Sequence, residues 1–276
     1  MLDPDLRDAS LELEGLQVRS GERLLVAEAS LSLQTGRILG LVGSSGSGKT
    51  LTARACIGLV EPRPGVVAGR LRVAWDGAVH EPYAALGTER ERRFRALRGR
   101  VIGWLPQEAR ASLDPLRVIG RQVDEVLRLR ARDGIPCPPG RRSVDDWLAA
   151  AGFPSPARVR ALFPHELSGG MAQRACIALA LARGSRFLLA DEPTTGLDPT
   201  VQAEILVQLG RLRDEGCGVL LITHDLRILP RLVDRICVMD EGRVVETLRG
   251  DQLSLARTLP ARRLLEATAR VAGGLL

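Results

Sequence analysis

The sequence contains a single lysine, Lys49, against 38 arginines. This bias toward arginine would replace lysine wherever a generic positive charge suffices, so the position where lysine survives is informative. Aromatic residues make up only 3% of the chain, although the net charge is +6 and the pI about 9.7. Proteins that bind single-stranded nucleic acids stack bases on aromatic side chains. Because such side chains are scarce, we do not expect nucleic acid as a partner.

Metal-ligand patterns and long apolar runs are also absent. The five cysteines form no C-x-x-C pair, and only three histidines occur, so neither a metal cage nor a disulfide framework is expected. No stretch reaches the ~18 consecutive apolar residues that span a bilayer. The segment Met1–Ser10 carries three aspartates and no apolar core like that of a signal peptide. We therefore expect a cytoplasmic protein that reaches a membrane only through a partner.

Short apolar runs alternate with helical patterns along most of the chain. The alternation at Leu11–Arg19 is typical of an edge strand, and Ile38–Val42 suits a buried parallel strand. Further strands are predicted at 24–33, 71–75, 101–105, 187–190, 219–223 and 236–239. Helices are predicted at 50–59, 172–183 and 200–215, in most of 120–163 outside the loop 134–140, and in the arginine-rich run 90–100. Strands that alternate with helices indicate an α/β fold with a mostly parallel sheet.

A glycine-rich loop follows the strand at 38–42 and precedes the helix that begins near residue 50. It matches the phosphate-binding pattern G-x-x-x-x-G-K-S/T with Gly43, Ser44, Ser45, Gly46, Ser47, Gly48, Lys49 and Thr50. Glycines let backbone N–H groups converge on phosphate oxygens, and the helix N-terminus adds partial positive charge. Lys49 would contact the β- and γ-phosphates, and Thr50 would offer its hydroxyl to Mg²⁺. The alternative is a simple glycine-rich turn.

Two carboxylates follow the apolar strand 187–190. Asp191 at the strand end would reach the Mg²⁺ shell, and Glu192 would polarise the attacking water, since a general base must lie within hydrogen-bond reach of it. An apolar run before two acids is also compatible with a capped strand, so the assignment depends on the glycine loop.

The stretch Leu167–Gln173 resembles the signature sequence of ABC ATPases. Ser168, Gly169 and Gly170 open a helix and create a second anion site from a hydroxyl, bare backbone N–H groups and a helix N-terminus. An ordinary helix cap by Ser168 is the alternative. A second phosphate site is useful when two chains share nucleotides, so a head-to-tail dimer is implied, with each ATP between one chain's Lys49 loop and the other's Ser168 loop.

This resemblance covers about residues 11–248 and implies further roles. Gln107 resembles the Q-loop glutamine that contacts Mg²⁺ and couples to a membrane partner. Asp198 lies in a stretch similar to the D-loop, which communicates across the dimer. His224 resembles the switch histidine that contacts the γ-phosphate. Lys49, Glu192 and His224 are therefore the expected catalytic residues, and Thr50, Gln107 and Asp191 the expected Mg²⁺ ligands, with ATP and Mg²⁺ bound.

The resemblance also implies a fold and a domain organisation. The expected fold is a P-loop NTPase (RecA-like) core with a mostly parallel sheet, an antiparallel β edge and an inserted α-helical subdomain. Residues 1–109 would form the first part of the ATP-binding core, 110–170 the helical subdomain ending in the signature, and 171–248 the second part of the core. Residues 249–276 would be a C-terminal tail.

Several stretches are similar to the peptide and nickel importer group of ABC ATPases, among them Ala111–Pro115, Phe163–Met171 and Val201–Leu206. The implied function is an ATPase subunit that energises uptake of peptides or nickel complexes, peripheral to the cytoplasmic face of the inner or plasma membrane. Its partners would be permease subunits, a second ATPase subunit (identical or related) and, indirectly, a solute-binding protein. The alternative is a non-transport ABC ATPase, such as a subunit of a phosphonate-degrading complex. The cargo is not encoded in these motifs.

One departure from the family concerns adenine. Members usually place an aromatic ring against the base about 25 residues before the glycine loop, but no Phe, Trp or Tyr precedes Trp75 here. Val18 or Arg19 would occupy that region, and an arginine plane can stack on a base. We expect weakened base discrimination.

Overall fold

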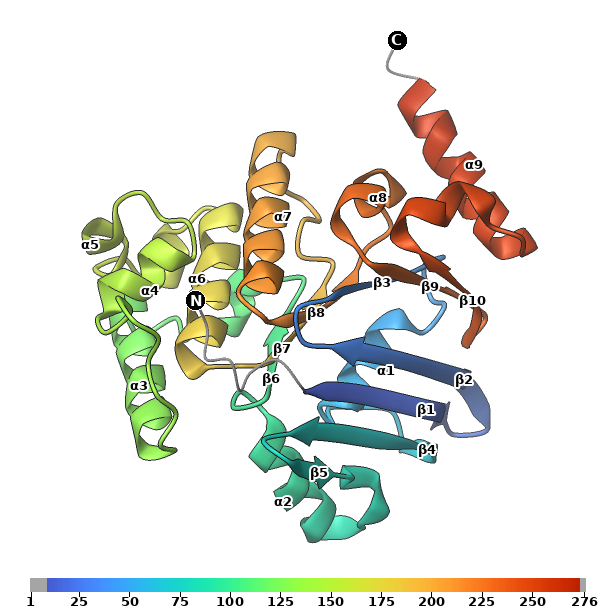
Figure 1. Ribbon diagram of the computed structural model, residues 1–276, viewed down its shortest axis with the longest axis horizontal. Helices are drawn as coiled ribbons and strands as arrows, with labels where there is room; N and C mark the ends of the chain where they lie inside the picture. The colour runs from blue at the N-terminus through green and yellow to red at the C-terminus, as the bar shows by residue number, and fades with distance from the viewer. Residues whose placement is uncertain (1–8, 274–276) are drawn as a thin grey trace.

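A ten-stranded sheet organises the computed structural model, which describes residues 9–273 (Figure 1). The expectation about the aspartate-rich segment Met1–Ser10 falls mostly on residues 1–8, which lie outside this range. The sheet order is β5-β4-β1-β2-β10-β9-β3-β8-β7-β6. The strands are β1 (Ser10–Ser20), β2 (Arg23–Gln34), β3 (Ile38–Gly43), β4 (Pro64–Trp75), β5 (Ala78–His80), β6 (Ile102–Leu105), β7 (Phe187–Asp191), β8 (Gly218–Ile222), β9 (Arg235–Asp240) and β10 (Arg243–Arg249).

The parallel part of the sheet joins β9, β3, β8, β7 and β6, as the apolar runs predicted. Successive residues of β8 belong to different hydrophobic clusters: Val219 and Leu221 pack in one, Leu220 and Ile222 in the other. Side chains of a strand point alternately to its two faces, so this strand is covered on both sides. Continuous burial of β3, β7 and β8 explains their unbroken apolar sequences.

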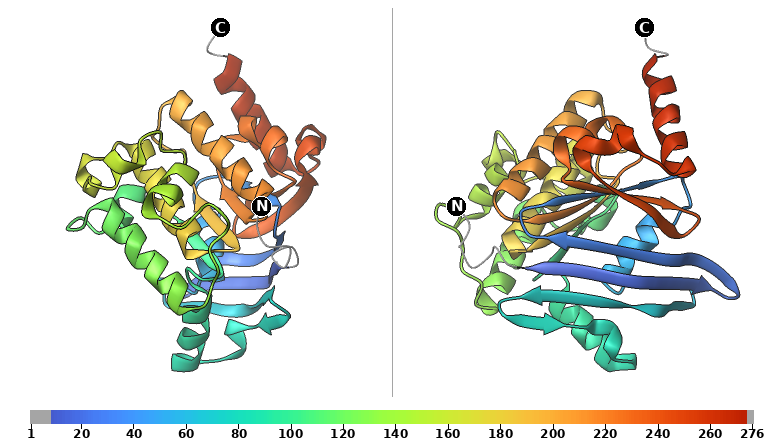
Figure 2. Two further views of the ribbon diagram at one scale, coloured as in Figure 1. Left: turned by 60° about the vertical axis from the view of Figure 1, so that its left-hand side comes forward. Right: turned by 45° about the vertical axis from the view of Figure 1, so that its right-hand side comes forward.

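The other end of the sheet is antiparallel, as expected, but one strand assignment was wrong. β1 pairs with β2 on one side and with β4 on the other, so it is an interior strand. Its alternation arises because one face packs on the core, where Leu11, Leu13 and Leu16 are buried. A strand with one covered face shows the same alternation at an edge or inside a sheet. The right-hand view of Figure 2 shows β1, β2 and β4 side by side.

Two hairpins were missed in the sequence. β4 and β5 are joined by Asp76–Gly77, and β9 and β10 by Glu241–Gly242, with positive φ at all four residues. Adjacent residues of positive φ are typical of tight two-residue hairpin turns, and Asp-Gly is a strong signal for one. This dipeptide would have predicted β5.

The helices cover both faces of the sheet. The α-helices are α1 (Lys49–Cys56), α2 (Gly87–Leu97), α3 (Ile119–Arg132), α4 (Val144–Ala150), α5 (Pro156–Val159), α6 (Gly169–Arg183), α7 (Pro199–Asp214), α8 (Leu229–Leu232) and α9 (Leu259–Gly273). The 3₁₀ helices are η2 (Pro82–Ala84), η3 (Ala109–Ser112), η4 (Pro164–Glu166), η5 (Leu226–Ile228) and η6 (Gly250–Leu255). Within residues 9–273, no helix is long and apolar enough to cross a membrane.

One helical prediction differs from the structure, and one α-helix lies where none was predicted. α1 ends at Cys56 rather than near residue 59, because Gly58 adopts positive φ and packs against the Phe94 ring, where a Cβ would lie 2.5 Å from the ring. The segment after residue 248, expected as a tail, contains η6 and α9, and α9 projects from the molecule (Figures 1 and 2).

Helices α3, α4 and α5 lie together beside α6 at the left of Figure 1. Their buried residues, such as Val123 and Trp147, belong to the same hydrophobic cluster as Leu188 of the sheet. The division of the chain into a core and a separate helical subdomain stays a prediction.

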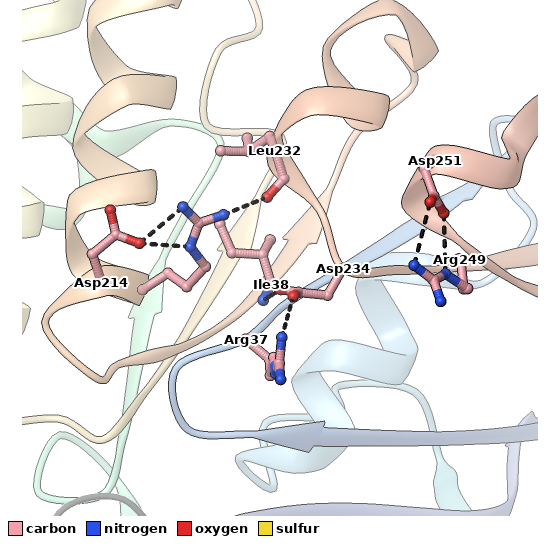
Figure 3. A network of polar contacts seen from close by, with 8 residues as sticks. Arg37, Ile38, Asp214, Leu232, Asp234, Arg249 and Asp251 are labelled. Carbon is pink, nitrogen blue, oxygen red and sulfur yellow. Dashed lines mark hydrogen bonds and ion pairs between the residues drawn. The ribbon is translucent and has the colours of Figure 1, made fainter.

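A polar network fixes the N-terminal ends of the central strands (Figure 3). Asp234, just before β9, accepts hydrogen bonds from the backbone N–H of Ile38 (2.8 Å) and from the guanidinium of Arg37 (2.8 Å). Arg213 of α7 donates to the Leu232 carbonyl (3.2 Å). These contacts set where β3 begins, and hence where it delivers the glycine loop at its other end.

Candidate active site

The glycine loop connects β3 directly to α1, as predicted. Gly46 and Gly48 have φ of 76° and 102°, a region that favours glycine. A Cβ at Gly43 would lie 2.1 Å from the Met239 carbonyl oxygen, and one at Gly48 would lie 3.3 Å from that of Leu25. The loop is therefore pressed against β9 and β2. Ser44, Ser45 and Gly46 are exposed at its tip, where a phosphate can reach their N–H groups.

Lys49, the first residue of α1, folds back over the loop. Its Nζ donates to the carbonyl oxygens of Gly43 (3.0 Å) and Ser44 (2.9 Å), and the residue is 7% exposed. Burial lowers the pKa of Lys49, whereas the negative charges of Glu192 and Asp191 act in the opposite direction. A cation held by neutral carbonyls in a buried loop is well placed to receive a phosphate.

Thr50 and Asp191 meet across the loop, although 141 positions separate them in the sequence. The Thr50 hydroxyl donates to Asp191 Oδ1 (3.0 Å), and Asp191 is 5% exposed at the end of β7. Burial raises the pKa of Asp191, opposed chiefly by this hydrogen bond. A hydroxyl and a carboxylate side by side are the hard oxygen donors that Mg²⁺ prefers, so the expected pair fits the metal.

Glu192 lies one residue beyond Asp191 in a left-handed conformation, with φ of 46°. Its Oε2 accepts a hydrogen bond from the Thr195 hydroxyl (2.9 Å) and lies 3.4 Å from Nδ1 of His224. The two residues predicted to activate water and to contact the γ-phosphate are thus adjacent. Thr195 was missed in the sequence, where its only signal is its position three residues after Glu192.

The signature segment begins α6. The Ser168 hydroxyl caps the helix by accepting from Met171 N (3.3 Å), yet Ser168 and Gly169 stay exposed. Gly170 is buried, and a Cβ there would lie 2.2 Å from Val201 Cγ1 of α7. Gly170 therefore allows α6 and α7 to approach closely, a packing reason that the sequence did not reveal. Ser168 therefore caps α6 and at the same time leaves the N-terminus of this helix exposed.

The D-loop and Q-loop residues both lie against the signature segment. A Cβ at Gly169 would lie 2.9 Å from Leu197, the neighbour of Asp198, and Asp198 caps α7 by accepting from Val201 N (3.0 Å). Gln107 is exposed, and its backbone carbonyl accepts from Nε2 of Gln173 (3.2 Å).

Gln173 was missed in the sequence. It is 3% exposed on α6, also donates to the Pro106 carbonyl (3.3 Å), and ties the Gln107 loop to the signature helix. A glutamine among the alanines of a buried helix face was the available signal.

The hairpin between β1 and β2 lies beside the glycine loop, since Leu25 and Val26 contact Gly48 and Arg19 pairs with the adjoining Leu24. Val18 is fully buried, whereas the Arg19 side chain is 44% exposed. Of the two positions expected near adenine, only Arg19 offers a surface to a base.

We expect ATP and GTP to be turned over at comparable kcat/KM, within roughly threefold, because an aromatic contact worth ~1–3 kcal/mol per base is missing and a guanidinium stacks on either purine. Steady-state assays with both nucleotides check this. Arg19→Ala should lower kcat/KM for ATP and for GTP to a similar degree. Arg23→Ala, at the start of β2, is the control and should change neither value. A strong preference for ATP would contradict it.

The fold and these contacts define a P-loop nucleotide-binding ATPase core. The family model for the ABC transporter matches residues 26–195. The nickel import ATP-binding protein NikD of Brucella abortus is 40% identical over 86% of both chains. The peptidoglycan transport ATP-binding protein YejF of Agrobacterium fabrum is 42% identical over 80% of this chain, which spans only 39% of that protein. The chain belongs to the ABC transporter family and is one of its ATP-hydrolysing subunits.

Solved structures agree with this fold. An ATP-binding cassette determined as a dimer in a post-hydrolysis state with ADP and Pi has a TM-score of 0.67 and 25% identity, and the match covers 87% of this chain and 98% of that one. The mixed sheet and its flanking helices are therefore those of an ABC cassette.

Proposed function

We propose that the chain energises an importer for peptides or nickel complexes by closing an ATP-dependent dimer. The observation that carries this is the division of the phosphate ligands: the Lys49 loop is built within one chain, while Ser168 and Gly169 stand exposed at a helix N-terminus. The similarity to a nickel import protein over 86% of both chains supports the cargo class. Permease subunits and, through them, a solute-binding protein are the proposed partners, at the cytoplasmic face of the membrane.

In this proposal the residues have separate tasks. The Lys49 ammonium and the N–H groups of the loop orient the β- and γ-phosphates, which is most of what phosphoryl transfer to water requires. Thr50, Asp191 and Gln107 would hold Mg²⁺, which would supply charge neutralisation at the phosphate oxygens. Glu192 accepts the proton of the attacking water.

Thr195 and His224 keep the Glu192 carboxylate in place until nucleotide binds, since both lie at its Oε2. Gln173 links the Gln107 loop to the signature helix, so closure of a partner on that helix would be transmitted to the loop that faces the permease. Residues 110–170 would then move as the helical subdomain.

A shared site predicts that two inactive variants complement each other. Lys49→Ala removes the phosphate ligand of one half-site. Ser168→Asp keeps the helix cap, which aspartate supplies as well as serine, but places a carboxylate against the phosphates. In a mixture, each heterodimer retains one intact site, so we expect roughly a quarter of the wild-type rate if subunits exchange freely.

The measurement is ATP hydrolysis by each variant alone and by their mixture after subunit exchange. Mixing two preparations of the same variant is the control. If wild-type protein is active while the mixture stays at the level of the single variants, the shared site is wrong.

A further inference from the structure

A second cavity, of about 680 Å³, lies at the opposite end of the parallel strands from the glycine loop. Its walls include residues that directly precede three strands: Arg100 and Val101 before β6, Ser185 and Arg186 before β7, and Cys217 before β8. The nucleotide site is built at the carboxyl ends of β3 and β7. The two sites are therefore separated by the length of the strands, and small-molecule pockets typically have volumes of about 300–1,000 Å³.

Buried polar atoms without a hydrogen-bond partner gather at these two sites. Five occur among residues 9–268, whose side chains are described, and two of them, Ser47 Oγ and Gln173 Oε1, belong to the nucleotide site. The other three are N–H donors: Trp147 Nε1, Arg183 Nη1 and Arg186 Nη1. Trp147 and Arg186 line the second cavity, and Arg183 is paired with Asp133, which also lines it. An unpartnered buried donor is costly, so the polar groups at and behind this wall are left incomplete by the protein itself.

The cavity also carries positive charge that its own carboxylates do not compensate. Its carboxylates are already paired: Asp76 with Arg186 (2.5 Å), Glu215 with Arg141 (2.7 Å) and Asp133 with Arg183, which is not in the wall. Two lining arginines have no carboxylate partner in the part of the chain whose side chains are described.

The first of these is Arg130, 4% exposed, whose guanidinium donates only to backbone carbonyls, those of Ile135, Pro136, Leu181 and Ala182. The second is Arg100, which is exposed and makes no hydrogen bond or ion pair among residues 9–268. Guanidinium groups with uncompensated charge favour carboxylate, sulfonate and phosphate groups.

The remaining wall is apolar and aromatic. Ile135, Pro136 and Pro138 of the loop between α3 and α4 form its accessible part. Trp75 and Trp147 lie behind it, 8% and 1% exposed, with Trp75 stacked on His80 and the Trp147 ring against the guanidiniums of Arg130 and Arg141. We propose that this cavity is a second ligand site, separate from the nucleotide site, for a small organic anion, with the arginines facing its anionic head and Ile135 and the prolines facing its apolar body.

A cysteine in the cavity wall can report ligand binding. Cys137 lines it and is exposed, whereas the other four cysteines are buried, so alkylation of the native protein reports Cys137. The probe is 8-anilinonaphthalene-1-sulfonate, which combines a sulfonate with an aromatic body. We expect saturable fluorescence binding that an excess of a non-hydrolysable ATP analogue does not displace. The bound dye should slow Cys137 alkylation about tenfold or more.

A matched pair of variants tests the charge. Arg100→Glu reverses the unpaired cation at the cavity and should weaken dye binding roughly tenfold. Arg121→Glu makes the same change at an exposed arginine of α3 that is outside the cavity wall, and should leave affinity unchanged. Basal ATP hydrolysis of both variants should match wild type, which shows that they are folded.

Several results would overturn the proposal. Displacement by the ATP analogue would place the dye in the nucleotide site, and unchanged alkylation at saturating dye would place it elsewhere. Equal affinity of the Arg100→Glu and Arg121→Glu variants for the dye would show that the charge of Arg100 has no role in binding. Protection by sulfate alone, at the same concentration as the dye, would show a simple anion site without a place for an organic body.

Discussion

Replacing Lys49 by arginine is expected to lower ATP hydrolysis by roughly 10²-fold or more, the usual cost of losing one preorganised phosphate or oxyanion ligand, in a chain that otherwise uses arginine as its basic residue. The Nζ atom fits between the Gly43 and Ser44 carbonyls, and the residue is almost completely buried. A planar guanidinium is larger and cannot act as a point charge in that space. Steady-state hydrolysis and nucleotide affinity measure the effect.

Arg54→Lys on the same helix is the matched control. Arg54 forms an ion pair with Glu61 (2.9 Å) at the surface, where lysine supplies the same charge, so activity should stay close to wild type. If Lys49→Arg retained activity within about threefold of wild type, the phosphate role of this lysine would be refuted.

Glu192→Gln is expected to leave ATP binding intact, reduce turnover by roughly 10²-fold or more, and trap a dimer with nucleotide bound. The amide oxygen of glutamine can still accept the hydrogen bond from Thr195, so the left-handed turn at residue 192 keeps its support. What is lost is a group that can take a proton from water. Single-turnover hydrolysis together with size-exclusion chromatography in ATP distinguishes slow chemistry from weak binding.

Glu28→Gln provides the control for loss of one carboxylate. Glu28 pairs with Arg243 at the surface of β2, at 2.9 Å, and its neutralisation should change neither turnover nor oligomeric state. A Glu192→Gln variant that stays monomeric and fully active would show that another group activates the water.

The sequence was sufficient for the elements whose signal is local. The central strands were predicted because both of their faces are buried, so every residue is apolar. The glycine loop was predicted because its backbone conformations need glycine at fixed spacing. The signature helix was predicted because Ser168 is both a family motif and an N-cap.

Features that depend on which segments pack against each other were harder to predict from the sequence. β1 was placed at an edge because alternation shows that one face is covered but does not show how many strands lie beside it. The helical content of the segment after residue 248 was missed as well. Gln173 escaped notice because hydrogen bonds to the carbonyls of Pro106 and Gln107, more than 60 residues away, leave no spacing pattern in the chain, and Thr195 because a hydroxyl three residues after Glu192 is not by itself a motif.

By itself, the sequence determined the chemistry available to this protein: one lysine in a phosphate loop, two acids after a buried strand, and a serine–glycine helix start, each a local pattern. Only the tertiary structure decided which of these groups meet. The Thr50 hydroxyl contacts Asp191 because β3 and β7 flank β8 and end at the same edge of the sheet. At the N-terminal ends of β6, β7 and β8, arginines and unpartnered N–H groups lie around a cavity. No sequence motif predicts this cavity, because residues far apart in the chain form it.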